Sequence, residues 1–225
     1  ISMKNIFIFT IGYACAVKKY IKHYLGLNLF TSPFDWNIIE DISQIQKLFE
    51  NNFENYIPIE SYHSPEILKK NNFTNKNHLT IMNNYYKIRF MHDNISESND
   101  NIYFYDIDKI VDKYKRRIDR TYKFIEEADK IIFLYGQQNF SFEYPNRFST
   151  NPEINENIIN LKLELNKLIN YFNKKYDNKN FEYLILNSNE NFEYVTKYLL
   201  KEIKNNKLIN GDITDKTKEL FKKKI

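Results

Sequence analysis

The residue whose setting most suggests chemistry is Cys15, the only cysteine of the 225-residue chain. It follows an apolar run at 5–11 and Gly12, and it opens a segment with helical spacing. A helix N-terminus offers free N–H groups and a positive partial charge, which lower a thiol pKa and can hold an oxyanion. Cys15 is therefore a candidate nucleophile. A small buried hydrophobic residue is the alternative interpretation of a free cysteine.

A histidine and two aspartates could serve a thiolate at this position. His92 follows the strand candidate at 85–91, and histidine is the natural general base near neutral pH. Either Asp35 or Asp93 could orient the imidazole. Because adjacent side chains of a strand point to opposite faces, Asp93 could do so only from a turn, and Asp35 ranks first. The structural alternatives are a surface position for His92 and a helix N-cap for Asp35.

Five further residues could bind a ligand rather than react with it. Gly12 and Tyr13 form the turn between the first strand and helix, where glycine allows a close approach to the backbone. Trp36, the only tryptophan, adjoins Asp35. Arg116 and Arg117 could hold a phosphate or carboxylate, or could belong to a solvated helix face.

Other motifs that carry chemistry are absent from the sequence. No G-x-x-x-x-G-K-[ST] loop, G-x-G-x-x-G fingerprint or G-x-S-x-G elbow occurs, so these phosphate-binding, dinucleotide-binding and serine-hydrolase signatures are excluded. The 4 histidines lack metal-ligand spacing, and one cysteine excludes an internal disulfide or a Cys-rich zinc site. We therefore expect no metal and no cofactor, and a reducing, cytoplasmic setting.

The elements that must position these residues alternate between strands and helices. Apolar runs predict strands at 5–11, 85–91, 130–135 and 181–186. Helical spacing predicts helices at 15–25, 35–52, 106–129, 156–172 and 191–204. This alternation predicts an α/β fold, with a mostly parallel sheet and helices on both faces, Rossmann-like or flavodoxin-like.

The whole chain, 1–225, is expected to form one α/β domain, because no linker divides it. Residues 36–82 are expected as a helical and irregular insertion after the first strand–helix unit, and 206–225 as a basic C-terminal tail. The net charge of +4 is too mild to favour a nucleic acid partner. No apolar run approaches the roughly 18 residues of a membrane span, so no membrane partner is expected.

Six segments occur together in the order of a known family. They are Gly12-Tyr13-Ala14-Cys15, Leu25-Gly26-Leu27, Pro33-Phe34-Asp35-Trp36, Phe90-Met91-His92-Asp93, Arg116-Arg117-Ile118-Asp119-Arg120 and Lys130-Ile131-Ile132-Phe133. Over roughly residues 5–137 the chain resembles the family described as papain-like cysteine peptidases, a domain of unknown function found in bacteria and large DNA viruses. The resemblance implies a Cys15 nucleophile and a His92 base.

The residues and the resemblance favour a cysteine-dependent hydrolase, either a peptidase or an acyl transferase. Its substrate would be a peptide, an amide or an anionic small molecule. One alternative is a Rossmann-like transferase for a nucleotide-sugar or other phosphorylated ligand, with Lys18, Arg116 or Arg117 binding the anion. Another is a non-catalytic recognition module. Abundant residues with A/T-rich codons indicate a low-GC genome. The expected location is the cytoplasm of a low-GC bacterium, or the host cytoplasm if the source is viral.

Overall fold

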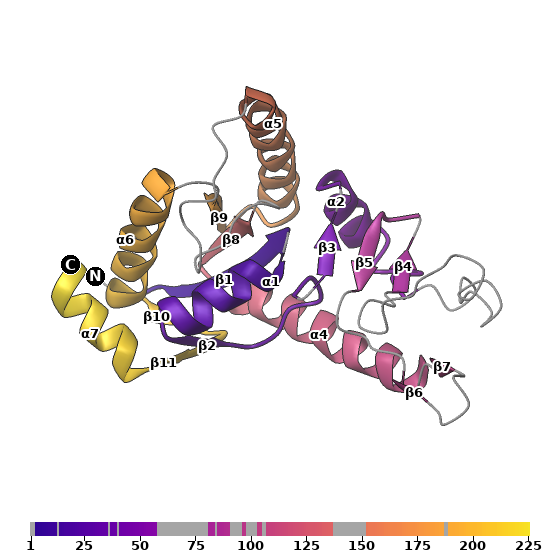
Figure 1. Ribbon diagram of the computed structural model, residues 1–225, viewed down its shortest axis with the longest axis horizontal. Helices are drawn as coiled ribbons and strands as arrows, with labels where there is room; N and C mark the ends of the chain where they lie inside the picture. The colour runs from indigo at the N-terminus through magenta and orange to yellow at the C-terminus, as the bar shows by residue number, and fades with distance from the viewer. Residues whose placement is uncertain are drawn as a thin grey trace.

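A computed structural model describes residues 3–12, 14–35, 37–39, 41–57, 81–83, 85–90, 96–97, 103–104, 107–136, 152–186 and 189–225. Its centre is a parallel sheet of four strands in the order β10-β1-β8-β9 (Figure 1). The strands are β1 (Asn5–Gly12), β8 (Lys130–Gly136), β9 (Asn180–Leu186) and β10 (Lys207–Leu208). This confirms the predicted fold class, and it confirms three of the four predicted strands.

The register of the sheet brings the ends of its three long strands together. Gly12 of β1 is paired with Gly136 of β8, which is in turn paired with Leu186 of β9. Because all three strands run in the same direction, their carboxyl ends form one edge of the sheet. The chain leaves each strand at this edge.

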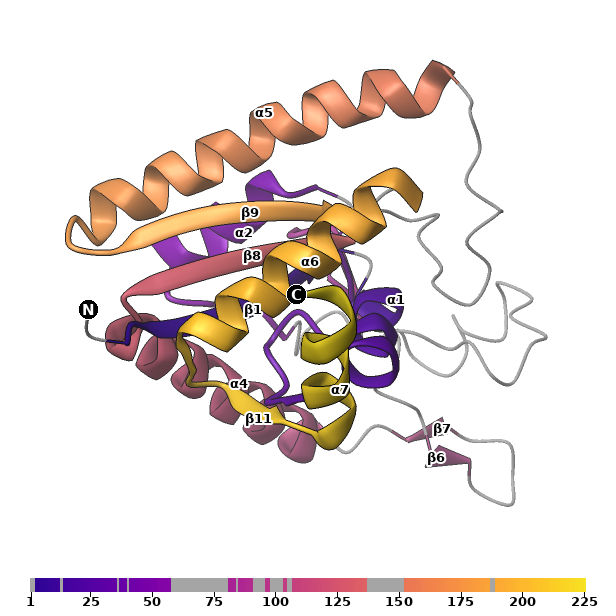
Figure 2. The same ribbon diagram turned by 90° about the vertical axis from the view of Figure 1, so that its left-hand side faces the viewer.

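Both faces of the sheet are covered by helices. Successive residues of β1 point to opposite faces and therefore enter two different buried clusters. Phe7, Phe9 and Ile11 belong to one buried cluster, and Ile6 and Ile8 belong to the other. The first face packs against α2 (Ser43–Glu50), α4 (Ile107–Glu127) and α5 (Pro152–Lys175). The second packs against α1 (Ala14–Lys19), the π-helix η1 (Tyr20–Tyr24) and α6 (Asn189–Asn205). Figure 2 shows α5 and α6 on their respective sides of β8 and β9.

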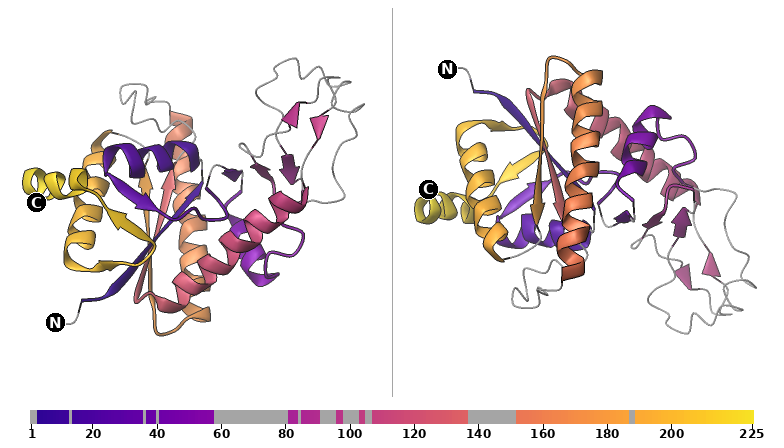
Figure 3. Two further views of the ribbon diagram at one scale, coloured as in Figure 1. Left: turned by 90° about the horizontal axis from the view of Figure 1, so that it is seen from below. Right: turned by 90° about the horizontal axis from the view of Figure 1, so that it is seen from above.

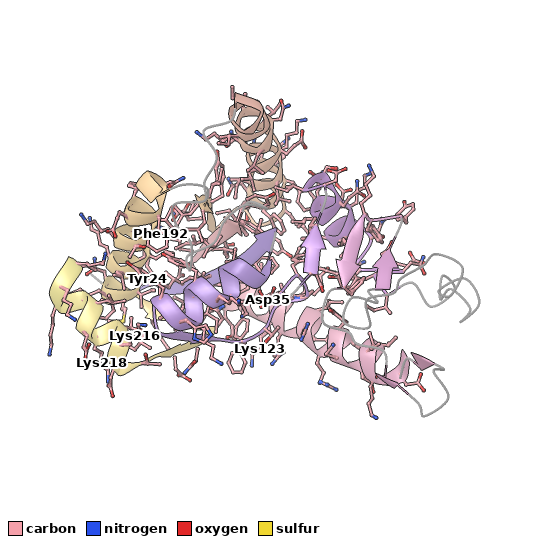
Figure 4. All side chains as sticks on the ribbon, viewed as in Figure 1. Tyr24, Asp35, Lys123, Phe192, Lys216 and Lys218 are labelled. Carbon is pink, nitrogen blue, oxygen red and sulfur yellow. The ribbon has the colours of Figure 1, made fainter. Side chains whose placement is uncertain are left out.

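The first helical segment runs through α1 and η1 to Tyr24, close to the predicted end at residue 25, and Gly26 follows. Gly26 has φ +71°, which suits glycine at this position. A side chain would not fit there, because a Cβ would lie 2.6 Å from the Thr214 hydroxyl oxygen. Tyr24 of η1 packs its ring against Phe192 of α6, with the ring centroids 4.7 Å apart (Figure 4).

The strand predicted at 85–91 is not part of the parallel sheet. Here β5 (Ile88–Phe90) lies between β3 (Asn37–Ile39) and β4 (Ile81–Asn83) in a separate antiparallel sheet. The physical reason is the short connection from β4 to β5, which can join antiparallel strands but not parallel ones. Figure 3 shows this small sheet to one side of the parallel sheet.

The helix predicted at 35–52 is shorter than expected, because β3 occupies its first part. α2 begins at Ser43, and the carboxylate that accepts a hydrogen bond from its first N–H belongs to Asp41 rather than to Asp35. The Asp41 carboxylate accepts hydrogen bonds from the Ser43 N–H at 3.0 Å and the Ser43 hydroxyl at 2.6 Å. Asp35 is therefore not a helix N-cap.

The last residues of the chain pack onto the body of the fold. β10 pairs with β1, and Asn210 continues the edge by bonding both the N–H and the carbonyl of Ile8. β11 (Gly211–Ile213) pairs with β2 (Leu27–Leu29), and α7 (Asp215–Lys224) follows. A small ladder of β6 (Ser96–Glu97) and β7 (Tyr103–Phe104) precedes α4.

Candidate functional site

Cys15 lies in the first turn of the helix that follows the central strand β1. It is the second residue of α1, and the chain reaches it through Gly12. The turn therefore lies at the carboxyl edge of the parallel sheet, where ligands of open α/β sheets bind. The predicted nucleophile occupies a position at which folds of this class carry function.

Gly12 adopts a backbone conformation that the turn requires. Its φ of +90° is rare for other residues. A Cβ at this position would lie 2.5 Å from the ring of Tyr135 and 2.8 Å from the Gly136 carbonyl oxygen. The space that the missing side chain of Gly12 leaves is therefore occupied by Tyr135 and Gly136 of the neighbouring strand β8.

Asp35 is fully buried, and both of its carboxylate oxygens have partners (Figure 4). Oδ1 accepts a hydrogen bond from the Thr10 hydroxyl of β1. Oδ2 accepts the Ser32 backbone N–H at 2.6 Å and lies 2.9 Å from the Lys18 ammonium. A carboxylate removed from water needs such partners, because an isolated buried charge is strongly disfavoured. Asp35 therefore joins the end of β1, the helix α1 and the turn that begins at Ser32.

Lys18 connects this carboxylate to the helix that contains Cys15. Its side chain is 9% exposed, so the ion pair with Asp35 is largely shielded from solvent. Its Nζ also lies 3.5 Å from the Leu29 carbonyl oxygen. Lys18 is three residues after Cys15, so the ion pair fixes the first turns of the helix against the turn at Asp35.

A buried polar cluster holds the other side of the turn at Asp35. The Pro33 carbonyl accepts hydrogen bonds from the Asn37 amide and the Tyr56 hydroxyl, both at 2.8 Å. The Tyr114 hydroxyl of α4 donates to Asn37 Oδ1 at 3.2 Å. Burial raises the pKa of Tyr56 and of Tyr114, so both phenols remain neutral donors. Pro33, Asp35 and Asn37 are therefore anchored by side chains from β1, α1 and α4.

The strand that leads to His92 runs beside this motif. β5 ends at Phe90, which is paired with Asn37, and β3 begins two residues after Asp35. In an antiparallel pair the end of one strand lies beside the start of the other. Phe90, the last residue of β5, therefore lies beside Asn37, two residues after Asp35.

Four of the predicted site residues lie outside the described residues. These are Tyr13, Trp36, His92 and Asp93. Of Cys15, the structure describes the backbone alone. The structure thus brings together Gly12, position 15 and Asp35 among the predicted residues.

The two arginines predicted to bind an anion lie on α4 in different environments. Arg116 is exposed, whereas Arg117 is half-buried with its guanidinium carbon 4.9 Å from the centroid of the Tyr114 ring. Burial, with Arg117 nearby, lowers the pKa of Lys113 to about 8. Arg120 approaches the turn at Asp35 from the same helix, because its Nη2 lies 3.4 Å from the Thr31 carbonyl oxygen.

Sequence analysis missed two residues of this site, Thr10 and Ser32. Thr10 has a signal in the sequence, because it is a polar residue between Phe9 and Ile11 of an apolar run. In the structure Thr10 is 2% exposed. A buried hydroxyl needs a hydrogen-bond partner, which in this protein is Asp35. Ser32 acts through its backbone N–H, which no side-chain pattern indicates.

Neither a metal-ligand cluster nor a membrane-spanning helix is found within the described ranges. No three His, Cys, Asp or Glu residues there are grouped as ligands of a metal ion. Among the helices of the same ranges, none combines the length and apolar character that crossing a membrane requires.

Comparison with known proteins identifies a family. Neither a curated protein nor a solved structure matches the chain. A family model described as "Putative papain-like cysteine peptidase" matches residues 7–180, a range that includes β1, α1, the turn at Asp35 and β8. The match covers more than half of the 225 residues, and the chain belongs to this family of papain-like cysteine peptidase domains.

Proposed function

We propose that the protein is a cysteine-dependent hydrolase, a peptidase or acyl transferase, with Cys15 as nucleophile and His92 as general base. The observation that carries the proposal is the place of Cys15 in the first turn of α1, at the carboxyl edge of the sheet. The N–H groups of this turn would stabilise a thiolate and then the oxyanion of the intermediate. The family of the chain supports the same class of reaction.

In the first half-reaction, the Cys15 thiolate would attack the carbonyl carbon of a peptide or amide. A C–S bond forms while the C–N bond breaks, and protonated His92 gives its proton to the departing amine. In the second half-reaction, His92 takes a proton from water, whose oxygen attacks the thioester. The carboxylic acid leaves and the thiolate is restored. A different acyl acceptor in place of water would give transfer rather than hydrolysis.

Either Asp35 or Asp93 would orient the imidazole of His92. Support for Asp35 comes from β5, which ends beside the segment that follows Asp35. A carboxylate can accept about four hydrogen bonds, and three donors reach Asp35. Support for Asp93 is its position next to His92 in the sequence.

The residues that flank the nucleophile and the turn would line the substrate cleft. Gly12 and Tyr13 precede Cys15, and Trp36 follows Asp35. Arg116 and Arg117 would attract an anionic part of a substrate, since both add positive charge to α4.

The test is the rate at which iodoacetamide alkylates the native protein. Because the chain has one cysteine, the measured rate belongs to Cys15 alone. We expect fast alkylation that saturates near neutral pH and becomes slower in His92→Ala, which removes the partner charge. The matched control is His23→Ala, which replaces an exposed histidine of η1 and should leave the rate unchanged.

Substrate turnover provides the second measurement. Cys15→Ser should abolish it while the fold is retained, because the two side chains are nearly isosteric. A cysteine that reacts only after denaturation, at a rate independent of His92, would contradict the proposal.

A further inference from the structure

Next to the proposed site, the structure contains a pocket of about 360 Å³. Its walls come from α1, η1, β2, the segment after β2, α4 and β11. The charged residues that line it are Lys18, Lys22, Arg120 and Asp212. Asp212 lies beyond residue 180, so part of the wall comes from outside the range of the family match.

Arg120 is held in place but has unused hydrogen-bonding capacity. Its guanidinium carbon lies 5.4 Å from the centroid of the Phe30 ring, and one nitrogen lies 3.4 Å from the Thr31 carbonyl oxygen. Its Nε is buried and has no hydrogen-bond partner in the described part of the chain. A guanidinium has five N–H donors arranged to match the oxygens of a carboxylate or phosphate.

The charges around the pocket leave an excess of positive charge. Three cations and one carboxylate line it, and Lys18 is already paired with Asp35. Burial, with Arg117 and Arg116 nearby, lowers the pKa of Arg120.

We propose that this pocket binds a small molecule through an anionic group, a carboxylate or a phosphate. Arg120 and Lys22 bind the anion, and Ile21 and Phe30 contact an apolar part of the molecule. The pocket has the size of a small-molecule site. The inference does not depend on the proposed reaction of Cys15, since binding is measured without turnover.

The test is calorimetric titration of the full chain at constant ionic strength. Phenyl phosphate and benzoate present the two anionic groups on the same ring, and benzyl alcohol is the uncharged control. We expect saturable binding of at least one anion and none of the alcohol. The tighter anion identifies the preferred group.

Four variants locate the binding. Arg120→Gln should weaken it about tenfold or more, and Lys22→Gln should weaken it less. Asp212→Asn should tighten the binding, because it removes a negative charge that repels the anionic ligand. Lys115→Gln, an exposed residue of α4 outside the pocket, is the matched control and should leave the affinity unchanged.

Each outcome decides the proposal. If neither anion binds, or if Arg120→Gln and Asp212→Asn leave the affinity as in the original protein, the proposal is wrong. If Arg120→Gln does not fold, the substitutions at the exposed residues Lys22 and Asp212 still test the proposal. Lys22→Gln should lower the affinity for the anion, and Asp212→Asn should raise it. Cys15→Ser should bind as the original protein does, which separates this site from the proposed catalytic one.

Discussion

Asp35 lies where three segments of the chain meet. Its carboxylate receives the Thr10 hydroxyl from β1, the Ser32 N–H from its own turn and the Lys18 ammonium from α1. The helix that contains Cys15 is thereby fixed to the end of the central strand. This buried charge therefore helps to position the candidate nucleophile.

Asp35→Ala should lower the free energy of unfolding by about 3–5 kcal/mol, because it leaves the Lys18 ammonium without its partner. Adding Lys18→Met should restore part of the loss. Urea denaturation measures both changes. Asp177→Ala removes an exposed aspartate and should cost no more than about 0.5 kcal/mol, so equal losses at the two aspartates would rule out this role.

The two candidate orienting carboxylates can be separated by the pH dependence of Cys15 alkylation. The carboxylate that orients His92 also stabilises the imidazolium, and through it the thiolate. Its replacement by asparagine should raise the apparent thiol pKa by about one unit, which slows alkylation about tenfold at pH values below that pKa and less near neutral pH. Asp35→Asn and Asp93→Asn are compared. A profile unchanged in both would exclude an orienting aspartate at either position.

The partners of Asp35 show what sequence analysis can and cannot reach at this scale. Asp35 and Lys18 could each be picked out by residue type and position. Their pairing could not, because it depends on how the turn at Ser32 folds back onto α1. The polar Thr10 within an apolar strand was the available signal that a buried partner exists.

Among the elements, the long parallel strands were predictable and the short ones were not. β1, β8 and β9 are covered on both faces, so their sequences are apolar at nearly every position. β2, β10 and β11 have two or three residues each and are held by contacts from distant segments. The strand at 88–90 was predictable, but its sheet was not, because periodicity does not tell which strand is the neighbour.

The arrangement of the two sheets differs from the papain architecture that the family description names. In papain-like enzymes a Cys-bearing helix opens one half of the molecule, and the histidine comes from an antiparallel barrel. In this protein the helix of Cys15 follows a parallel strand, while the strand before His92 belongs to a small antiparallel sheet. The parallel sheet and the antiparallel sheet would each supply one member of the proposed pair.

Gly12→Ala tests the turn between β1 and α1. The φ of +90° is strained for alanine, and the new Cβ would collide with the Tyr135 ring and the Gly136 carbonyl. We expect a loss of about 1–3 kcal/mol in the free energy of unfolding, measured by denaturation. A stability equal to that of the original protein would mean that the turn can relax without cost.

The molecule as a whole buries tyrosines on both sides of its sheet. Tyr56 and Tyr114 lie in the cluster on the α4 side, and Tyr20 lies in the cluster on the α6 side. The Tyr20 hydroxyl is 2.9 Å from that of Thr196. Burial raises the pKa of all three phenols.

This burial predicts a loss of stability in alkali. Above about pH 10 the unfolded chain releases phenolic protons that the folded chain retains, so the free energy of unfolding falls as the pH rises. Each buried tyrosine contributes on the order of 1 kcal/mol per pH unit. Urea denaturation across this range measures the slope.

Tyr114→Phe should make that slope shallower, although it also removes a hydrogen bond to Asn37. Tyr85→Phe, at an exposed position, is the matched control. Identical slopes in the two variants would show that buried phenols do not cause the effect.

The pairing of β1 with the last residues of the chain affects how the protein is made. Ile8 bonds to Asn210, 202 residues later, so a ribosome must synthesise this long intervening stretch before that side of β1 is covered. An apolar strand with an open edge can pair with other chains. We therefore expect nascent chains, and chains terminated before Asn210, to need chaperone protection and to aggregate without it, since β1 is synthesised long before the segment that covers it.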